Sequence, residues 1–185
     1  MAFLPSLERS PVLLNVFKAF PATVEPLLDY HEALMRGASP LSPAERELIA
    51  AVVSTLNGCR YCAGVHTATA EYLGVAPGSV VQLAGEGVTA GIEPKLQPLI
   101  SYVRKLTQAP TSLNRADADA VFAAGWEEQA LHDAVAVCCL FNFMNRYVEG
   151  LGIEADTDYF TLAGERLGRG GYAGLKDLLG LARGG

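Results

Sequence analysis

Two cysteines and a histidine lie close together in the chain, at Cys59, Cys62 and His66. On a helix that advances about 100° per residue, these side chains fall within an arc of about 60° and share one face. A thiolate that attacks a peroxide becomes a sulfenic acid, and a second thiol three residues away can condense with it to a disulfide. The spacing therefore predicts a two-cysteine redox centre with a histidine beside it.

Such a centre needs a thiolate, because the protonated thiol, with an ordinary pKa of about 8.5, is a poor nucleophile. The free amides at a helix start, the neighbouring Arg60 and an imidazolium at His66 would each favour the thiolate. His66 could also move the proton between the thiol and the departing alkoxide, provided that a carboxylate fixes its tautomer. The sequence thus predicts an activated thiol, and it predicts that a carboxylate elsewhere in the chain binds His66.

Two glutamates in the preceding helical segment are candidates for that carboxylate. Glu45 stands three residues after Ser42, the spacing of a capping box, so it already has a structural task. Glu47 lies against the mostly apolar run 48–53, where a carboxylate needs a partner. We expect Glu47 to meet His66, although a glutamate exposed on the helix surface is the alternative.

Helix signals recur along the chain and no alternating strand pattern interrupts them, so the fold class is all-α. Ser42 and Pro43 fix one helix start, and Asn57-Gly58 breaks that helix, which places the cysteine pair at the N-terminus of the next one. The expected helices span about 11–20, 24–36, 43–56, 59–73, a turn near 77, 94–107, 114–124, 127–150 and 158–181, the last hinged at 168–171.

The composition narrows the class of protein. The 185 residues are half apolar and carry a net charge of −6, which fits one helical domain over residues 1–185 without a basic stripe for nucleic acid. The first residues do not have the pattern of a signal peptide, and the longest apolar run, 134–144, is too short to cross a membrane. We expect a cytoplasmic protein in which thiols stay reduced.

Other reactive or polar residues lie in the helix expected at 127–150. Cys138 and Cys139 lie within its apolar run without an activating base, so both are predicted to be core residues. Asn142, Asn145 and Arg146 must find partners there, in structural hydrogen bonds or across a subunit interface, and we favour the structural role. The apolar circumference of this helix also favours homo-oligomerisation.

A zinc site is the metal-binding alternative for the same cysteine motif. A closed structural zinc site needs four ligands, and Cys59, Cys62 and His66 supply three. His31 or His132 would have to complete it, yet neither has ligand-like companions, and each is predicted to be a surface histidine or one with satisfied hydrogen bonds. We therefore expect no metal and no cofactor.

The pattern Glu47 … Cys59-x-x-Cys62-x-x-x-His66 resembles the alkylhydroperoxidase D-like branch of the carboxymuconolactone decarboxylase superfamily, particularly its peroxidase-related members. The likeness extends to residues 42–47 and 141–146. It implies an all-helical, homo-oligomeric fold with the cysteines near a subunit contact. The motif core would span about 24–150, and a helical extension would follow at about 154–182.

The resemblance also implies roles: Cys62 as the peroxidatic thiol, Cys59 as the resolving thiol, and His66 with Glu47 as the proton relay. The substrate would be a hydroperoxide and the electron donor a thiol, a lipoylated protein or a thioredoxin-like protein. Well-studied members have a histidine before the second cysteine, where this chain has Tyr61. Members with decarboxylase activity lack the cysteine pair, so that reaction is not expected.

The leading hypothesis is therefore a thiol-dependent peroxidase that cycles between a dithiol and a Cys59–Cys62 disulfide. One alternative is a general thiol–disulfide oxidoreductase. The other is a non-enzymatic helical oligomer whose cysteines bind a metal or sense oxidants.

Overall fold

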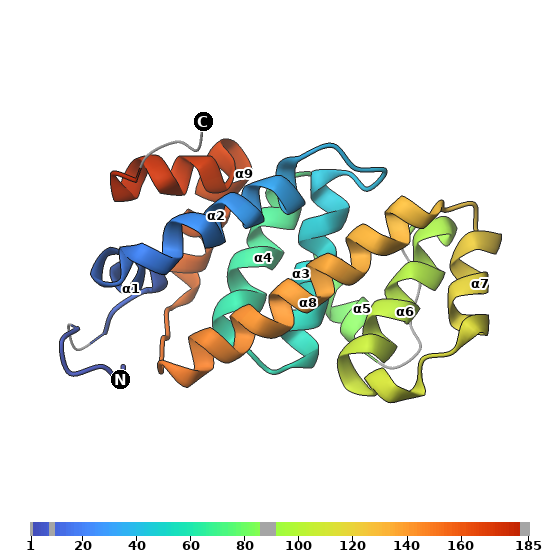
Figure 1. Ribbon diagram of the computed structural model, residues 1–185, viewed down its shortest axis with the longest axis horizontal. Helices are drawn as coiled ribbons and strands as arrows, with labels where there is room; N and C mark the ends of the chain where they lie inside the picture. Colours follow the sequence, from blue (N-terminus) through green and yellow to red (C-terminus); the bar gives the residue numbers. More distant parts are fainter. Residues whose placement is uncertain (1, 8–9, 86–91, 182–185) are drawn as a thin grey trace.

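The computed structural model describes residues 2–7, 10–85 and 92–181, and within these residues every regular element is a helix (Figure 1). The all-α prediction is confirmed. The helices are α1 (Leu13–Ala19), α2 (Pro21–Arg36), α3 (Pro43–Leu56), α4 (Arg60–Tyr72), α5 (Ser79–Ala84), α6 (Gln97–Gln108), α7 (Arg115–Ala123), α8 (Glu128–Gly150) and α9 (Thr157–Leu179), with short 3₁₀ turns at Pro94–Leu96 and Pro110–Ser112.

The helix starts follow local chemistry. Ser42 caps α3, accepting from the Glu45 amide at 3.2 Å while the Glu45 carboxylate accepts from the Ser42 amide at 2.7 Å, as the capping box predicted. The start of α2 was predicted too late, at about residue 24. It begins at Pro21, because proline suits the first turn of a helix, where its missing amide donor is not needed.

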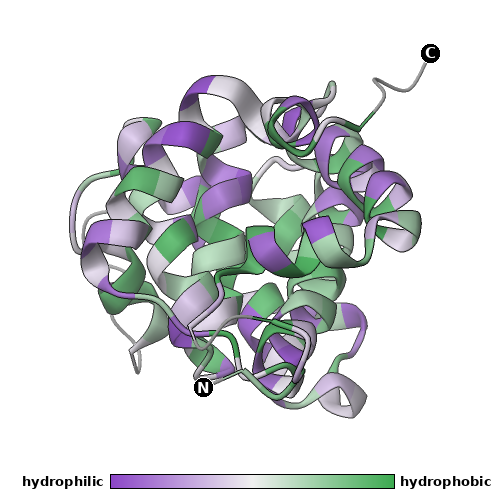
Figure 2. Ribbon diagram, turned by 90° about the vertical axis from the view of Figure 1, so that its left-hand side faces the viewer, coloured by the Kyte–Doolittle hydropathy of each residue, from purple (hydrophilic) through white to green (hydrophobic). Residues whose placement is uncertain are grey.

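Helix α3 is the centre of the molecule. Residues 46–54 are buried without interruption, which is the pattern of a helix surrounded by other helices. It packs against α4, α8, α5 and α6, and α4 in turn packs against α9. Figure 1 shows α5, α6 and α7 at one end of the elongated molecule and α1, α2 and α9 at the other. Hydrophobic residues gather on the inward faces of the helices (Figure 2).

The turn between α3 and α4 is fixed against α8 by amide side chains. Gly58 takes the left-handed conformation (φ 72°) that glycine adopts without steric cost. Asn57 donates from Nδ2 to the Asn145 side chain at 2.8 Å, and Asn145 donates to Ser54 Oγ at 2.9 Å. The turn that orients the cysteine pair is therefore held by hydrogen bonds that are buried or partly buried.

Helix α9 lies directly on α4. Gly164 permits this approach, because a Cβ atom at that position would lie 2.5 Å from the Cβ of Ala68 and 2.9 Å from the amide nitrogen of Thr69. The predicted hinge is confirmed at Gly171, whose φ is 61°. After the kink, the Glu32 carboxylate accepts from the amides of Tyr172 and Ala173 at 2.7 and 2.9 Å. The kink thus turns the end of α9 back toward α2.

No helix in the described part of the chain is long and apolar enough to cross a membrane. The expected extension, about 154–182, corresponds to α9, while residue 182 lies outside the described residues.

Candidate functional site

The two cysteines occupy the start of α4, as predicted. Cys59 is the residue that precedes its first turn and Cys62 lies within that turn; both are buried and neither forms a disulfide. Cys62 lines a cavity, whereas Cys59 is not among the residues that line it. A small molecule inside the cavity would therefore meet the Cys62 sulfur first.

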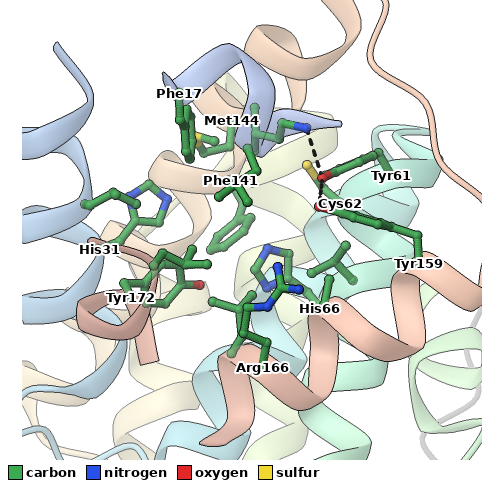
Figure 3. A pocket seen from close by; sticks show the side chains of 17 residues that line it. Phe17, His31, Tyr61, Cys62, His66, Phe141, Met144, Tyr159, Arg166 and Tyr172 are labelled. Atoms are coloured by element: carbon green, nitrogen blue, oxygen red, sulfur yellow. Dashed lines mark hydrogen bonds between the residues drawn. The ribbon is translucent and has the colours of Figure 1, made fainter. Parts of the chain in front are cut away.

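The cavity has a volume of about 70 Å³ and is mostly apolar (Figure 3). That is more than the roughly 10–15 Å³ that one water molecule needs, so the cavity has room for several atoms of a ligand beside the sulfur. Helices α1, α2, α4, α8 and α9 contribute to its wall. The lining residues are Leu13, Leu14, Phe17, Leu28, His31, Tyr61, Cys62, Val65, His66, Phe141, Met144, Tyr159, Ala163, Arg166, Leu167, Tyr172 and Leu175.

His66 lies one helical turn after Cys62 and lines the same cavity. Its Nδ1 is 2.6 Å from Oε2 of Glu47, so the contact predicted between these two residues is present. With the carboxylate ionised, Nδ1 donates and therefore carries the proton. The described residues give Nε2 no hydrogen-bond partner, which leaves it available to a molecule in the cavity.

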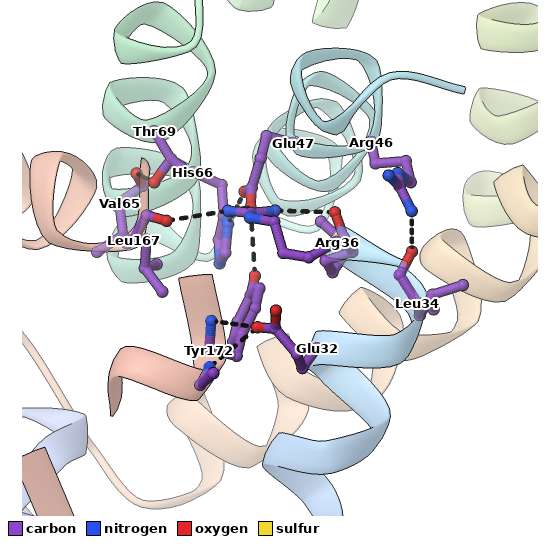
Figure 4. A network of polar contacts seen from close by, with 12 residues as sticks. Glu32, Leu34, Arg36, Arg46, Glu47, Val65, His66, Thr69, Leu167 and Tyr172 are labelled. Atoms are coloured by element: carbon purple, nitrogen blue, oxygen red, sulfur yellow. Dashed lines mark hydrogen bonds and ion pairs between the residues drawn. The ribbon is translucent and has the colours of Figure 1, made fainter. Parts of the chain in front are cut away.

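Glu47 is fully buried but fully satisfied (Figure 4). Its Oε1 accepts from Nη2 of Arg36 at 2.7 Å and from the Tyr172 hydroxyl at 3.4 Å, while Oε2 faces His66. Burial alone would raise the pKa of Glu47, but the neighbouring His66 and Arg36 outweigh it and lower that pKa. Glu47 is therefore an ionised carboxylate held between a guanidinium and an imidazole.

The expected activation of the thiol is not present in the fold. The hydrogen bond with Cys59 raises the pKa of Cys62, burial raises it further, and Asn145 opposes the rise only in part. Arg60 is exposed and lines a separate depression with Glu149, away from the cavity. The Cys62 thiol is therefore protonated at neutral pH, and a base must remove its proton when it reacts.

His31 also faces the cavity, from α2, and it is buried rather than superficial. Its Nδ1 donates to the carbonyl of Leu27 at 2.8 Å, so the prediction of satisfied hydrogen bonding is confirmed. Burial lowers the pKa of His31 to about 4; His66 lowers it too, while Leu27 and Glu47 have the opposite effect. The folded state therefore holds a neutral imidazole here.

This neutral imidazole should make the fold sensitive to mild acid. Between pH 6.5 and about 4, the unfolded chain binds a proton at His31 that the folded chain excludes. The fold has its full stability with respect to His31 above pH 6.5, the pKa of this histidine in the unfolded chain. As the pH falls from 6.5 to about 4, we expect the free energy of unfolding to decrease by roughly 3 kcal/mol. Urea unfolding at both ends of the window measures this loss.

The variant His31→Phe should remove most of that loss, because phenylalanine keeps the ring packed against Tyr172 but cannot bind a proton. The matched control is His132→Gln, at a histidine whose side chain is 74% exposed, and it should keep the wild-type pH dependence. An equal loss in His31→Phe and wild type would contradict the assignment.

The remaining predictions had mixed outcomes. Cys138 is buried, but Cys139 is exposed, so its assignment to the core was wrong: consecutive helical residues point about 100° apart and cannot both face α6. Asn145 has the predicted structural role, and Arg146 is exposed and bonded to Asn142 within its own helix. In the part of the chain that the structure describes, no group of three or more His, Cys, Asp or Glu residues could hold a metal ion.

Three residues of the site were missed at the sequence level: Arg36, Arg166 and Tyr172. Arg36 is the last residue of α2, where a basic side chain is common because it complements the helix dipole, so nothing indicated its burial. The two residues of α9 reach the site only because that helix folds back over α4. The amphipathic pattern of the C-terminal segment was the available signal that it covers something.

A model of the carboxymuconolactone decarboxylase family matches residues 21–103, which include Glu47, both cysteines of the motif and His66. No match was found among curated proteins. Two solved structures are similar over most of their length. An uncharacterized peroxidase-related protein from Silicibacter sp. TM1040 is 28% identical with a TM-score of 0.72, covering 79% of this chain and 78% of that one.

The second structure is described as an alkylhydroperoxidase AhpD core, an uncharacterized peroxidase-related protein from Ralstonia eutropha JMP134. It is 27% identical with a TM-score of 0.73, covering 82% of this chain and 79% of that one. The family match, the shared fold and the arrangement of Cys59, Cys62 and His66 agree with one another. Residues 21–103 of this chain thus match the carboxymuconolactone decarboxylase family, and its fold is similar to that of alkylhydroperoxidase D-like, peroxidase-related proteins.

Proposed function

We propose that this protein is a thiol-dependent peroxidase that reduces hydroperoxides through a Cys59–Cys62 dithiol–disulfide cycle. The observation that carries the proposal is the cavity shared by Cys62 and His66, with Glu47 bound to the far side of the imidazole. A candidate nucleophile, a candidate base and an orienting carboxylate thereby belong to one site. Two similar structures are described as peroxidase-related proteins, which agrees with this chemistry.

In the first step, Nε2 of His66 takes the proton of the Cys62 thiol, and the sulfur attacks the outer oxygen of the hydroperoxide. The O–O bond breaks, an S–O bond forms, and the proton on His66 passes to the departing alkoxide. The products are an alcohol and a sulfenic acid at Cys62. Throughout, Glu47 stabilises the imidazolium that forms for a moment on His66.

In the second step, the thiol of Cys59 attacks the sulfenic sulfur, and water leaves as the disulfide forms. The two electrons that reduced the peroxide thus come from the two thiols. A dithiol reductant must then restore them by exchange, and a lipoylated or thioredoxin-like protein is the predicted donor. Cys59 suits the resolving role because it is a hydrogen-bonding neighbour of Cys62 and lies outside the cavity lining.

Tyr61 does not replace the family's histidine as a base. Its hydroxyl accepts from the Leu13 amide at 3.2 Å and donates to the Tyr159 hydroxyl at 2.9 Å. Burial raises the pKa of Tyr61, and Tyr159 adds to the rise, so the phenol keeps its proton. The proton relay in this proposal therefore consists of His66 and Glu47 alone.

Self-association and a cytoplasmic location stay predictions. The side chain of Phe143 on α8 is 51% exposed and stacks on Tyr147, which is an apolar surface of the kind that the oligomer hypothesis needs.

The test is a count of free thiols before and after one equivalent of cumene hydroperoxide, with mass mapping of any disulfide. Loss of two thiols into a Cys59–Cys62 disulfide, with one equivalent of cumyl alcohol formed, is the expected result. The control variant Cys139→Ser should behave like wild type, because Cys139 is exposed and does not line the cavity. Unchanged thiols with unconsumed peroxide would contradict the proposal.

Treatment with diamide in the absence of peroxide distinguishes the peroxidase from the alternative, a general thiol–disulfide oxidoreductase. A general thiol–disulfide oxidoreductase would form the same disulfide with diamide but would not consume the hydroperoxide.

A further inference from the structure

Arg166 is the charged residue of the cavity that the proposed reaction does not use. It projects from α9, and Figure 3 shows its side chain extending into the cavity on the side where the His66 ring lies. Every other lining residue is apolar, a tyrosine, a cysteine or a histidine, and none is a carboxylate. The wall of the cavity therefore holds one permanent positive charge and no negative charge to balance it.

Arg166 has no ion pair or hydrogen bond with any described residue. The positions three and four residues away on α9, where a helical ion-pair partner would stand, are Leu162, Ala163, Arg169 and Gly170. The adjacent Glu165 forms no ion pair with Arg166. Other cations of the same region are paired: Arg36 binds Glu47 at 2.7 Å.

The same contrast holds at the end of α9, where Lys176 binds Asp29 at 2.6 Å. A partly buried guanidinium is costly to leave unpaired, so its position calls for an anionic ligand.

We propose that Arg166 binds a carboxylate on the substrate, so that the preferred hydroperoxide has a small apolar body with an anionic end. This inference rests on the proposed peroxidase function for the identity of the reacting group, but not for the binding of the carboxylate. A guanidinium donates two parallel hydrogen bonds to a carboxylate, which suits a single arginine at an apolar wall.

The position of Arg166 fits this orientation of the ligand. Besides the cavity, it lines a shallow depression on the outer side of α9, together with Leu162, Glu165 and Arg169. Arg166 thus stands where the cavity meets the surface, whereas Cys62 lies on α4 within the first turn. A ligand held by its carboxylate at Arg166 would have its apolar body in the cavity that Cys62 also lines.

Binding can be measured without any reaction by using 4-isopropylbenzoate, which has the apolar body and the carboxylate but no peroxide. Calorimetry on reduced wild-type protein should show binding, and the Arg166→Gln variant should bind about tenfold more weakly or worse, as expected for loss of a charge-assisted hydrogen bond. The neutral methyl ester should show no such difference between the two proteins. The control variant Arg169→Gln removes an exposed arginine of the same helix and should bind the carboxylate like wild type.

Equal binding of the acid by wild type and Arg166→Gln, or no binding by either, would overturn the inference.

Turnover then links the binding site to the reaction, with 4-carboxycumene hydroperoxide and its methyl ester as the two substrates. The kcat/KM of the acid divided by that of the ester should fall about tenfold in Arg166→Gln, mainly through the KM of the acid. If neither hydroperoxide is reduced but the acid still binds through Arg166, the peroxidase proposal fails and the binding site stands. If both are reduced with equal kcat/KM by wild type, the substrate preference fails and the peroxidase proposal stands.

Discussion

Replacement of Cys62 by serine should abolish peroxide reduction, with a loss of at least about a thousandfold in turnover. A serine hydroxyl cannot form a sulfenic acid or a disulfide. It also ionises far less readily than the Cys62 thiol, even though the pKa of that thiol is raised. The substitution is close to isosteric at a site that is 3% exposed, so the fold should be retained. The measurement is consumption of cumene hydroperoxide with dithiothreitol as the electron donor, alongside circular dichroism to check folding.

The partner variant Cys59→Ser separates the two roles. It should still consume one equivalent of peroxide, because Cys62 lines the cavity and stays intact, but the sulfenic acid should persist and react with dimedone. If Cys62→Ser retained undiminished turnover, the assignment of the nucleophile would be wrong. If dimedone labelled Cys59 in the wild type, the two roles would be reversed.

The partnership of Glu47 and His66 could be predicted because it depends on local arguments. Glu45 is already engaged in the capping box. Glu47 lies beside an apolar run, where a carboxylate that becomes buried needs a partner. The break at Asn57-Gly58 then returns the chain, so that α4 packs against α3 and brings His66 to Glu47. Most helix boundaries were predictable for similar reasons, since capping and glycine signals act within a few residues, although the start of α2 was predicted too late.

The protonation of Cys62 could not be predicted in this way. The helix start and Arg60 are visible in the sequence and both suggest a lowered pKa. What decides it is the environment: Arg60 is exposed, Cys62 is buried, and the hydrogen bond with Cys59 raises the pKa further. Burial depends on α8 and α9, which begin 66 and 95 residues after Cys62 in the chain, and no local pattern specifies it.

The same limit explains why Arg36 was missed. Its ion pair with Glu47 joins the end of one helix to the buried face of the next, and its Nη2 also donates to the Leu167 carbonyl on α9 at 3.2 Å. Three helices must be in place before this guanidinium becomes buried. Sequence reasoning thus identified the carboxylate that needs a partner, and it identified His66 but not Arg36 among the side chains that bind it.

Substitution of Glu47 should therefore lower the free energy of unfolding more than substitution of any other residue at the site. Glu47→Ala would leave the Arg36 guanidinium, only 12% exposed, without its carboxylate, and removal of one partner of a buried ion pair typically costs about 3–5 kcal/mol. Urea unfolding at neutral pH measures this loss. In wild type the contribution is present above pH 4.5 and is lost on further acidification, because the pKa of Glu47 is lowered from that value by folding.

A double substitution separates this stabilising role from the relay. Arg36→Met combined with Glu47→Leu removes both charges and should recover most of the stability, since a buried ion pair can be replaced by apolar residues of similar size at little cost. Turnover should not recover, because His66 would still lack the carboxylate that fixes Nδ1 as the protonated nitrogen and stabilises the imidazolium. Recovery of stability and turnover together would mean that Glu47 only neutralises Arg36, and that His66 moves the proton unaided.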